Sequence, residues 1–374
     1  MAERPLSAVV LAAGEGTRMR SERPKPLHLL CGRAMVRYVL DSLAECRTER
    51  VVVVVGHGAE RVTKKLQAEE PDLLLDFIEQ HRQQGTGDAV AVGLTAFPDD
   101  DLEPGADDGA DILVLPGDTP LLRATTISRL VERHRQSDAA CTVLTARLAE
   151  PAGYGRVVRG RDGRVARIVE HRDATDEQRE IDEINTSIYC FRRSVLAPAL
   201  RRIQPANDQG EYYLTDVVEV LHDAGYGVTA VAAEDPDETH GVNDRAQLAA
   251  AEAELRRRTN QRWLKLGVTM VDPDRTYVDT TVDLATDVTL FPGTILQGQT
   301  VIGRGAEVGP DTRLIDCVVG ARSTVEQTTA RDAEIGADAH VGPYAHVAPG
   351  ESVADGTITG PFFAAPAPDA ADGP

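Results

Sequence analysis

The first part of the chain alternates short apolar runs with stretches of helical periodicity. Residues 51–55 form an unbroken valine run, which is typical of a strand buried on both faces. Residues 34–46 instead place Met35, Val39 and Leu43 on one face of a helix. The same two patterns predict further strands at 7–13, 73–78 and 111–115, and further helices at 86–97 and 124–135. This alternation predicts an α/β fold with a doubly wound, mostly parallel, Rossmann-like sheet.

The middle of the chain predicts a hairpin and then a long helix. Apolar stretches at 156–159 and 165–169 flank an Arg-Asp-Gly turn, and further strands are predicted at 186–191 and 228–232 with a helix at 214–224. Residues 244–265 are charged, rich in alanine and free of glycine and proline. They predict a helical arm that leaves the first domain.

From about residue 288 the pattern changes to a period of six. An aliphatic residue leads each unit, as in Ile302-Gly303, Val308-Gly309, Ile335-Gly336 and Val341-Gly342. Such a period predicts a parallel β-helix in which each unit forms one face of a triangular coil with the aliphatic side chain inward. We therefore expect a first domain at 1–243, a helical arm at 244–266, a β-helix at 267–360 and a disordered tail at 361–374, which is rich in Ala, Pro and Asp.

Composition and charge narrow the functional class. The 374 residues include 40 basic and 60 acidic side chains, for a formal net charge of −20. A strongly negative field repels nucleic acid and anionic membrane surfaces, so neither is expected as a partner, and an anionic substrate would need local cations or a metal ion. The five cysteines form no C-x-x-C pair and there is no apolar run of transmembrane length or signal peptide. We expect a cytoplasmic location with reduced thiols.

A glycine-containing loop follows the first predicted strand, where ligands bind in such sheets. The string Leu11-Ala12-Ala13-Gly14-Glu15-Gly16-Thr17-Arg18 lets the backbone approach a ligand closely, and its N–H groups attract anions. Arg18 and Lys25 add two cations within one short loop. This arrangement predicts a site for a triphosphate, the alternative being a structural turn with two solvated cations.

Two further motifs lie at predicted strand ends. Gln80 carries a donor and an acceptor suited to a pyrimidine edge, and Gly85 and Thr86 open the next helix, where Thr86 is expected as its N-cap. Asp118 follows the strand at 111–115, where a carboxylate suits Mg²⁺, or else caps a turn. Asn243 offers a second oxygen ligand, the alternative being an N-cap for the helical arm, a role that Asp244 could also take.

Polar residues around the predicted hairpin form a third group. Gly155 suggests backbone contact with a ligand, and Glu170 and Asn185 offer groups that bind sugar hydroxyls, although each is alone more often a solvated or capping residue. The string at 209–216, Gln-Gly-Glu-Tyr-Tyr-Leu-Thr-Asp, predicts a lid or a helix start.

Taken in order, these strings resemble the bacterial bifunctional N-acetylglucosamine-1-phosphate uridyltransferase/glucosamine-1-phosphate acetyltransferase family. The string at 169–179, Val-Glu-His-Arg-Asp-Ala-Thr-Asp-Glu-Gln-Arg, is particular to that family among sugar nucleotidylyltransferases. The resemblance implies a uridyltransferase domain followed by a left-handed β-helix that forms a homotrimer. It implies Arg18 and Lys25 as the catalytic phosphate contacts, Asp118 and Asn243 as Mg²⁺ ligands, nucleotide contacts at Leu11, Ala12, Ala13, Gly14, Gln80, Gly85 and Thr86, and sugar contacts at Gly155, Glu170, Asn185 and Thr186.

Three departures from the family pattern bear on activity. His346 and Ala348 stand where the family has arginines, the second of which serves the amino-sugar phosphate in acetyl transfer. The chain also ends before the coils that carry the family's acetyltransferase residues, so we expect no acetyltransferase activity. Pro116 replaces an aromatic residue of some members, which leaves the local nucleotide contact open.

The predicted reaction joins UTP and N-acetylglucosamine 1-phosphate into UDP-N-acetylglucosamine with release of pyrophosphate, in the presence of Mg²⁺. A close alternative is the same chemistry with another sugar 1-phosphate or with dTTP. A retained acetyltransferase is a weaker alternative. An alternative of a different class is a non-catalytic β-helix scaffold that displays a nucleotide-binding domain.

Overall fold

A computed structural model describes residues 4–69, 73–97 and 109–365. The chain divides into two compact units, each of which is described by itself. The first consists of the chain up to His28 together with Ala34–Leu248, and the second of Leu29–Arg33 together with the chain from Ala249 onward. Within the described residues no helix is long and apolar enough to cross a membrane.

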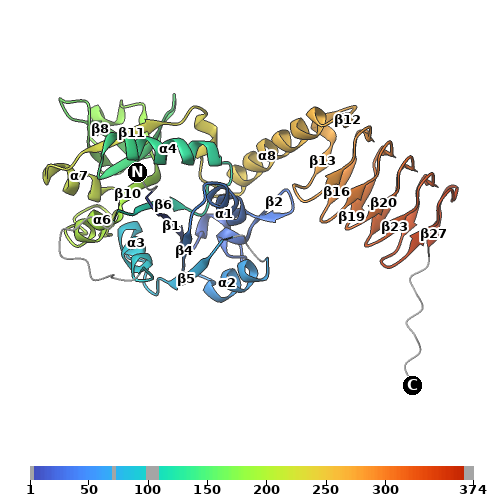
Figure 1. Ribbon diagram of the computed structural model, residues 1–374, viewed down its shortest axis with the longest axis horizontal. Helices are drawn as coiled ribbons and strands as arrows, with labels where there is room; N and C mark the ends of the chain where they lie inside the picture. Colours follow the sequence, from blue (N-terminus) through green and yellow to red (C-terminus); the bar gives the residue numbers. More distant parts are fainter. Residues whose placement is uncertain (1–3, 70–72, 98–108, 366–374) are drawn as a thin grey trace, which may run out of the picture. The chain divides into compact units, whose positions relative to one another are not determined.

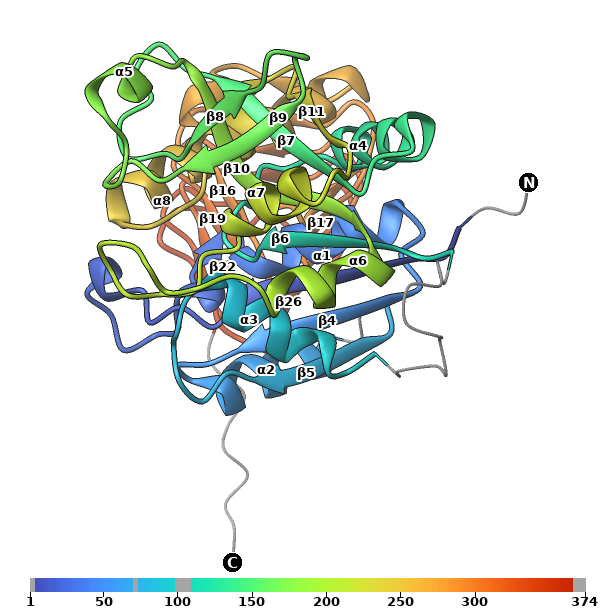
Figure 2. The same cartoon turned by 90° about the vertical axis from the view of Figure 1, so that its left-hand side faces the viewer.

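The first unit is built on a nine-stranded sheet, labelled in Figure 1. Its central strands run in the order β11-β7-β10-β6-β1-β4-β5, and β10 is antiparallel to both of its neighbours while the other adjacent pairs are parallel. Figure 2 shows the β8–β9 hairpin, whose strand β8 pairs with β10. The strands are β1 (Leu6–Ala12), β4 (Arg50–Val55), β5 (Leu75–Glu79), β6 (Asp111–Pro116), β7 (Cys141–Arg147), β8 (Arg156–Arg159), β9 (Val165–Val169), β10 (Glu183–Arg192) and β11 (Val228–Ala232). The predicted mostly parallel sheet is thus confirmed.

Helices cover both faces of this sheet because its strands are apolar on both sides. Val52 and Val54 pack into one buried cluster with α3, α6 and α7, while Val51, Val53 and Val55 pack into another with α1, α2 and α4. The prediction of a doubly buried valine strand is therefore confirmed. The helices are α1 (Met35–Glu45), α2 (Ala59–Ala68), α3 (Thr86–Leu94), α4 (Ala124–Ser137), α5 (Asp176–Arg179), α6 (Arg193–Leu200) and α7 (Asp216–Asp223).

Some elements of the first unit lie outside the predicted pattern. The helices α2 and α6 and the strand β7 were not among the predicted elements. Short 3₁₀ turns also occur in this unit, namely η1 (Thr17–Met19), η2 (Lys25–Leu27) and η3 (Pro236–Thr239). The short pair β2 (Leu29–Leu30) and β3 (Arg33–Ala34) follows η2, and its residues 29–33 belong to the second unit. Helix α8 (Arg245–Lys265), close to the predicted arm, begins in the first unit and ends in the second.

The second unit is a parallel β-helix whose coils are stacked in three sheets (Figure 1). Inward aliphatic side chains follow one another in register, as Leu290, Val308, Val325 and Val341 do in the first sheet, and all four are fully buried. The first sheet is β12 (Thr269–Met270), β15 (Thr289–Leu290), β18 (Glu307–Val308), β21 (Thr324–Val325) and β24 (His340–Val341). The predicted β-helix is confirmed.

The other two sheets have the same construction. The second is β13 (Tyr277–Val278), β16 (Ile295–Gln297), β19 (Arg313–Ile315), β22 (Thr329–Arg331), β25 (His346–Val347) and β27 (Ala364–Ala365). The third is β14 (Asp283–Leu284), β17 (Val301–Ile302), β20 (Val318–Val319), β23 (Glu334–Ile335) and β26 (Ser352–Val353). A 3₁₀ turn, η4 (Pro273–Arg275), lies between β12 and β13.

The predicted start of the disordered tail is wrong for its first residues. Ala364 and Ala365 form β27, which pairs in parallel with His346 and Val347. Ala365 is buried, because its small side chain continues the inward apolar row of the sheet. The rest of the predicted tail, from residue 366, lies outside the described residues.

Candidate functional site

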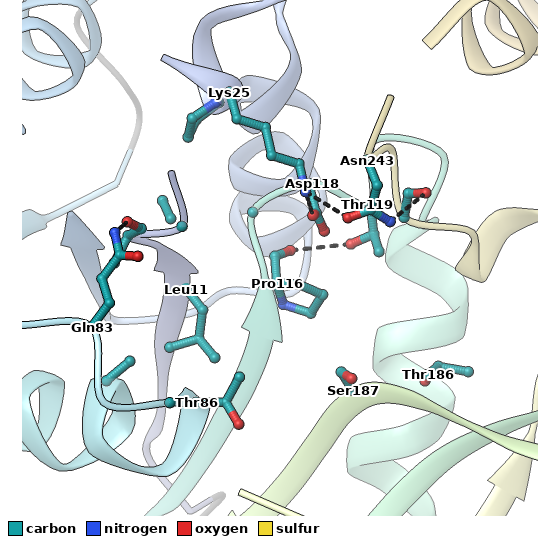
Figure 3. A pocket seen from close by; sticks show the side chains of 18 of the residues that line it. Leu11, Lys25, Gln83, Thr86, Pro116, Asp118, Thr119, Thr186, Ser187 and Asn243 are labelled. Atoms are coloured by element: carbon teal, nitrogen blue, oxygen red, sulfur yellow. Dashed lines mark hydrogen bonds and ion pairs between the residues drawn. The ribbon is translucent and has the colours of Figure 1, made fainter. Parts of the chain in front are cut away.

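A cavity of about 450 Å³ lies at the carboxyl ends of β1 and β6 in the first unit. Its walls come from the loop after β1, the loop after β6, the start of α3, the middle of β10 and the segment before α8. The residues are Leu11, Ala12, Ala13, Gly14, Lys25, Pro26, Gln80, Gln83, Gly85, Thr86, Ala89, Pro116, Gly117, Asp118, Thr119, Gly153, Tyr154, Asn185, Thr186, Ser187, Glu211, Thr239, Gly241 and Asn243. Polar groups from distant parts of the chain thus converge at this edge of the sheet (Figure 3).

The glycine loop leaves open space on the cavity side. A Cβ added to Gly14 would meet no atom within 4 Å. Gly16 has φ +63°, and a Cβ there would come within 2.7 Å of the Cβ of Lys25, so glycine is needed for Lys25 to pack against this turn. Gln83 donates a hydrogen bond of 2.8 Å to the carbonyl oxygen of Ala13. The loop is therefore held from behind, while Gly14 remains open to a ligand.

Two cations and two oxygen-bearing side chains meet at the upper wall of the cavity. The Lys25 ammonium forms an ion pair with Asp118 and donates a hydrogen bond of 2.9 Å to Asn243 Oδ1. Arg18 donates to the same Asn243 oxygen at 3.0 Å. Figure 3 shows the Lys25 side chain extending to Asp118 and Asn243. The four predicted phosphate and metal residues are thus brought together, although Arg18 does not itself line the cavity.

The donor set of Asp118 and Asn243 fits Mg²⁺. Their oxygens already share one cation, the Lys25 ammonium, so they lie close enough to share another. One carboxylate and one amide oxygen suit an ion that takes its remaining ligands from water and phosphate. The described residues hold no group of three or more His, Cys, Asp or Glu side chains suited to a metal, so a site here would need a substrate to complete it.

Asn243 is available for this role because a neighbour caps the following helix. Asp244 Oδ1 accepts a hydrogen bond of 2.8 Å from the backbone N–H of Gln247, in the first turn of α8. The backbone N–H of Val242 donates to the carbonyl oxygen of Asp118 at 2.8 Å. This bond holds the segment before α8 against the loop after β6, and so keeps the two oxygen-bearing side chains together.

On the opposite wall, Gln80 is largely engaged by the protein. Its side chain is 5% exposed, and its Nε2 donates to Asp88 Oδ2 at 2.6 Å and to the carbonyl oxygen of Gly85 at 3.3 Å. Gly85 has φ +109°, and a Cβ there would lie 2.5 Å from the carbonyl oxygen of Tyr212. Only glycine therefore fits at position 85, between α3 and the 209–216 segment. That segment leads into α7, which begins at Asp216.

The predicted capping role of Thr86 is wrong. The N-cap position of α3 is Gly85, and Thr86 is the first residue of the helix. The Thr86 hydroxyl instead accepts a hydrogen bond of 3.0 Å from the backbone N–H of Leu214. The reason is the tight approach of the 209–216 segment, which supplies a donor that a sequence pattern does not reveal.

The predicted sugar residues form a layered wall. Asn185 lines the cavity, and its backbone N–H donates a hydrogen bond of 2.8 Å to the carbonyl oxygen of Gly155. Gly155 and Glu170 are not among the lining residues and lie behind Asn185, since a Cβ on Gly155 would be 3.4 Å from Glu170 Oε1 and 3.5 Å from the Asn185 Cβ. Burial raises the pKa of the Glu170 carboxyl, against a hydrogen bond from Thr215 that lowers it.

Several lining residues were not predicted. Gln83, Tyr154 and Glu211 lie in motifs from which the sequence analysis selected other residues. Their polar side chains stand close to glycines in the sequence, and this proximity is the signal that could have identified them. Burial, together with the charge of Asp118, raises the pKa of the Tyr154 hydroxyl. Ser187 had no signal in the strand pattern.

Comparisons with known proteins agree with this geometry. A family model described as the MobA-like NTP transferase domain matches residues 8–223. The bifunctional protein GlmU of Thermobifida fusca (strain YX) is 46% identical over 335 residues, which cover 90% of this chain and 68% of that protein. This chain belongs to the GlmU family. The GlmU proteins of Halalkalibacterium halodurans and Streptomyces coelicolor are 43% and 47% identical, covering 88% and 89% of this chain and 70% and 67% of the two relatives.

Membership of the GlmU family confirms the resemblance drawn from the sequence motifs. The matched region runs from within β1 to the end of α7, so every strand of the first unit's sheet except the edge strand β11 falls in it. Most of the residues that line the cavity fall in this matched region, and Thr239, Gly241 and Asn243 follow it in the chain. The first unit is therefore a nucleotidyltransferase unit.

Proposed function

We propose that this chain joins UTP to N-acetylglucosamine 1-phosphate, forming UDP-N-acetylglucosamine and pyrophosphate. The observation that carries the proposal is the meeting of Lys25, Arg18, Asp118 and Asn243 beside an open glycine loop. Two anions must approach each other in this reaction, and a cluster of cations with a metal-binding oxygen pair lowers their repulsion.

In the proposed step, a phosphate oxygen of the sugar phosphate attacks the α-phosphorus of UTP in line. The new phosphorus–oxygen bond replaces the bond to the β-phosphate, and that oxygen leaves with pyrophosphate. The attacking phosphate is already ionised near neutral pH, so no protein base is needed. Catalysis rests on positioning and on stabilisation of charge.

The chain's own residues divide this work. Asp118 and Asn243 would hold Mg²⁺, which supplies positive charge to the phosphates when bound. Lys25, which contacts both Asp118 and Asn243, and Arg18, which contacts Asn243, would then donate to the phosphates of UTP and of the leaving pyrophosphate. The N–H groups near Gly14 would cradle the triphosphate, with Leu11, Ala12 and Ala13 beside the nucleoside. Gln80, Gly85 and Thr86 would border the base, and Asn185 and Thr186, backed by Gly155 and Glu170, the sugar.

Acetyltransferase activity is not part of the proposed function. His346 lies on β25 with its side chain outward, and Ala348 is buried, so neither position offers the arginine of the family pattern. Consumption of acetyl-coenzyme A with glucosamine 1-phosphate tests this point directly. Measurable consumption above an enzyme-free control would contradict it.

The main test is pyrophosphate release from a panel of nucleotides and sugar 1-phosphates with Mg²⁺. We expect the highest kcat/KM with UTP and N-acetylglucosamine 1-phosphate. A higher value with dTTP or with another sugar phosphate would replace the substrate assignment. Release with no pair, despite nucleotide binding by calorimetry, would instead favour a non-catalytic scaffold. Chelation of Mg²⁺ should abolish release and leave the far-ultraviolet circular dichroism spectrum unchanged.

A further inference from the structure

Strand β10 carries a local irregularity at the cavity wall. Asn185 pairs with Thr145 of β7, and the next paired residue is Ile188 with Leu144, so Thr186 and Ser187 are left between two paired positions. Such bulges re-aim side chains and are frequent beside active sites. Both unpaired residues line the cavity.

Ser187 adopts a backbone conformation that residues other than glycine rarely adopt. Its φ is +62°, in the left-handed region. The Asn185 Oδ1 atom accepts a hydrogen bond of 3.1 Å from the backbone N–H of Ser187, and this short turn holds the conformation. A strained residue at a functional site is retained only where the surrounding structure fixes it. The bulge therefore points to a role for the Ser187 side chain.

The two hydroxyl groups of the bulge differ in their partners. Thr186 Oγ1 donates a hydrogen bond of 2.7 Å to the carbonyl oxygen of Leu144, away from the cavity. Ser187 is exposed, and its hydroxyl has no hydrogen-bond partner within residues 4–69, 73–97 and 109–365. Figure 3 shows Ser187 beside Thr186 on the strand, on the side of Pro116 away from Asp118. The hydroxyl that the bulge offers to a ligand is thus that of Ser187.

We propose that Ser187 is a specificity-determining residue that hydrogen-bonds a hydroxyl group of the sugar 1-phosphate. The inference rests on the proposed function and deepens it. Ser187 adjoins Asn185 and Thr186 on the wall assigned to the sugar, whereas the base-side residue Gln80 follows β5 and Thr86 begins α3. A serine hydroxyl both donates and accepts, so it can pair with a sugar hydroxyl in either direction.

Ser187→Ala and Ser187→Gly separate the hydroxyl from the backbone strain. Ser187→Ala removes only the hydroxyl, so we expect the KM for the sugar phosphate to rise about tenfold while the KM for UTP is unchanged. Ser187→Gly should raise the same KM and also raise Tm, because glycine adopts positive φ without cost. Gln327→Gly, at φ +44° in the β-helix, is the matched control, in which strain is relieved far along the chain from the sugar wall and the KM values should not change.

Deoxy-sugar phosphates identify the contact. Wild-type protein should discriminate against the analogue that lacks the paired hydroxyl, and Ser187→Ala should accept that analogue and the parent sugar equally. If Ser187→Ala keeps the wild-type KM and discrimination while the wild type turns over, the role of Ser187 is disproved and the proposed function stands. An inactive wild type would overturn the proposed function. Calorimetry would then still decide the role of Ser187. The proposed contact predicts that Ser187→Ala binds a UDP-sugar more weakly than the wild type does, while the two proteins bind UTP equally.

Discussion

At the scale of single residues, Asp118 is the side chain on which the proposed chemistry depends most. Its carboxylate pairs with Lys25, and both side chains are largely shielded, with 24% and 13% of their surfaces exposed. A charge that is this shielded acts more strongly than one in open solvent. Removing it changes both the metal-binding pair and the position of the lysine.

We expect Asp118→Asn to lower pyrophosphate release about 10²- to 10³-fold, because one charged contact of the transition state is lost while the side-chain shape is kept. Glu132→Gln, on the exposed side of α4, is the control for loss of one negative charge and should retain wild-type rates. Circular dichroism should be the same for all three proteins. A rate near that of wild type would reject the assignment of Asp118.

Asp216, at the start of α7, links stability to pH. Burial, with smaller contributions from the charges of Glu219 and Asp173, raises the pKa of the Asp216 carboxyl to about 6. The same carboxyl titrates near 3.8 in the unfolded chain, so the folded state binds its proton more tightly than the unfolded chain does. The stabilisation associated with the protonated carboxyl is therefore complete below pH 4 and is lost as the pH rises through about 6.

Asp216→Asn should accordingly raise Tm at pH 7 to 8 by about 2 °C and have no effect near pH 4. The group is partly exposed and begins a helix, where a negative charge is favourable, so the gain is small. Thermal melts across this pH range measure it, with Glu219→Gln as a variant that removes one of the two repelling charges. A gain that is the same at pH 4 and pH 8 would show that ionisation is not its cause.

At the scale of elements, the β-helix depends on inward side chains that are stacked in register. Leu314 in β19 is fully buried and lies between Leu296 of β16 and Ala330 of β22. Each coil contributes few inward residues, so a lost side chain cannot be replaced by a neighbour in the same coil. The resulting cavity would remain largely unfilled.

Leu314→Ala should lower the free energy of unfolding of the β-helix by about 2–5 kcal/mol. Thr329→Ala, an exposed position on the adjacent strand β22, should change it by less than about 0.5 kcal/mol. Urea titrations followed by circular dichroism compare the two. Equal effects would mean that the inward row does not carry the stability of the coils.

At the scale of the whole molecule, the two units have separate apolar cores. Two clusters cover the faces of the mixed sheet, and a third fills the β-helix from Trp263 to Ala365. A unit with its own core is expected to fold as a unit of its own. The residues proposed for the reaction all lie in the first unit, so the β-helix is free for assembly.

We propose a homotrimer formed through the β-helix. Val301 and Val318 are paired neighbours on outward positions of one sheet, and 40% and 49% of their surfaces are exposed. Adjacent exposed valines form an apolar surface that contact with another chain would bury. Light scattering should give three times the 40.2 kDa mass of the chain, independent of nucleotide. A mass equal to one chain across the micromolar range would contradict the trimer.

Most of the strands and helices and the six-residue repeat were predictable from the chain alone, whereas α2, α6 and β7 were not predicted. A valine run, an amphipathic stretch and a period of six each report a local periodicity, and local periodicity decides which face of an element is buried. The loop with Gly14 and Gly16 was predictable for the same reason, because a strand that stops at glycines ends at the binding edge of such a sheet.

Tertiary structure decided which side chains point into the cavity. Lys25 meets Asp118 and Asn243 across 93 and 218 positions of sequence, and no short pattern encodes that distance. Thr86 and Thr186 were both predicted to face a ligand, yet their hydroxyls bond Leu214 and Leu144 of the protein. Ser187 lines the cavity instead, at the register shift between Asn185 and Ile188, where it is left unpaired with β7. Sequence periodicity thus determined the elements, whereas non-local hydrogen bonds and positive φ decided the direction of the groups that would meet a substrate.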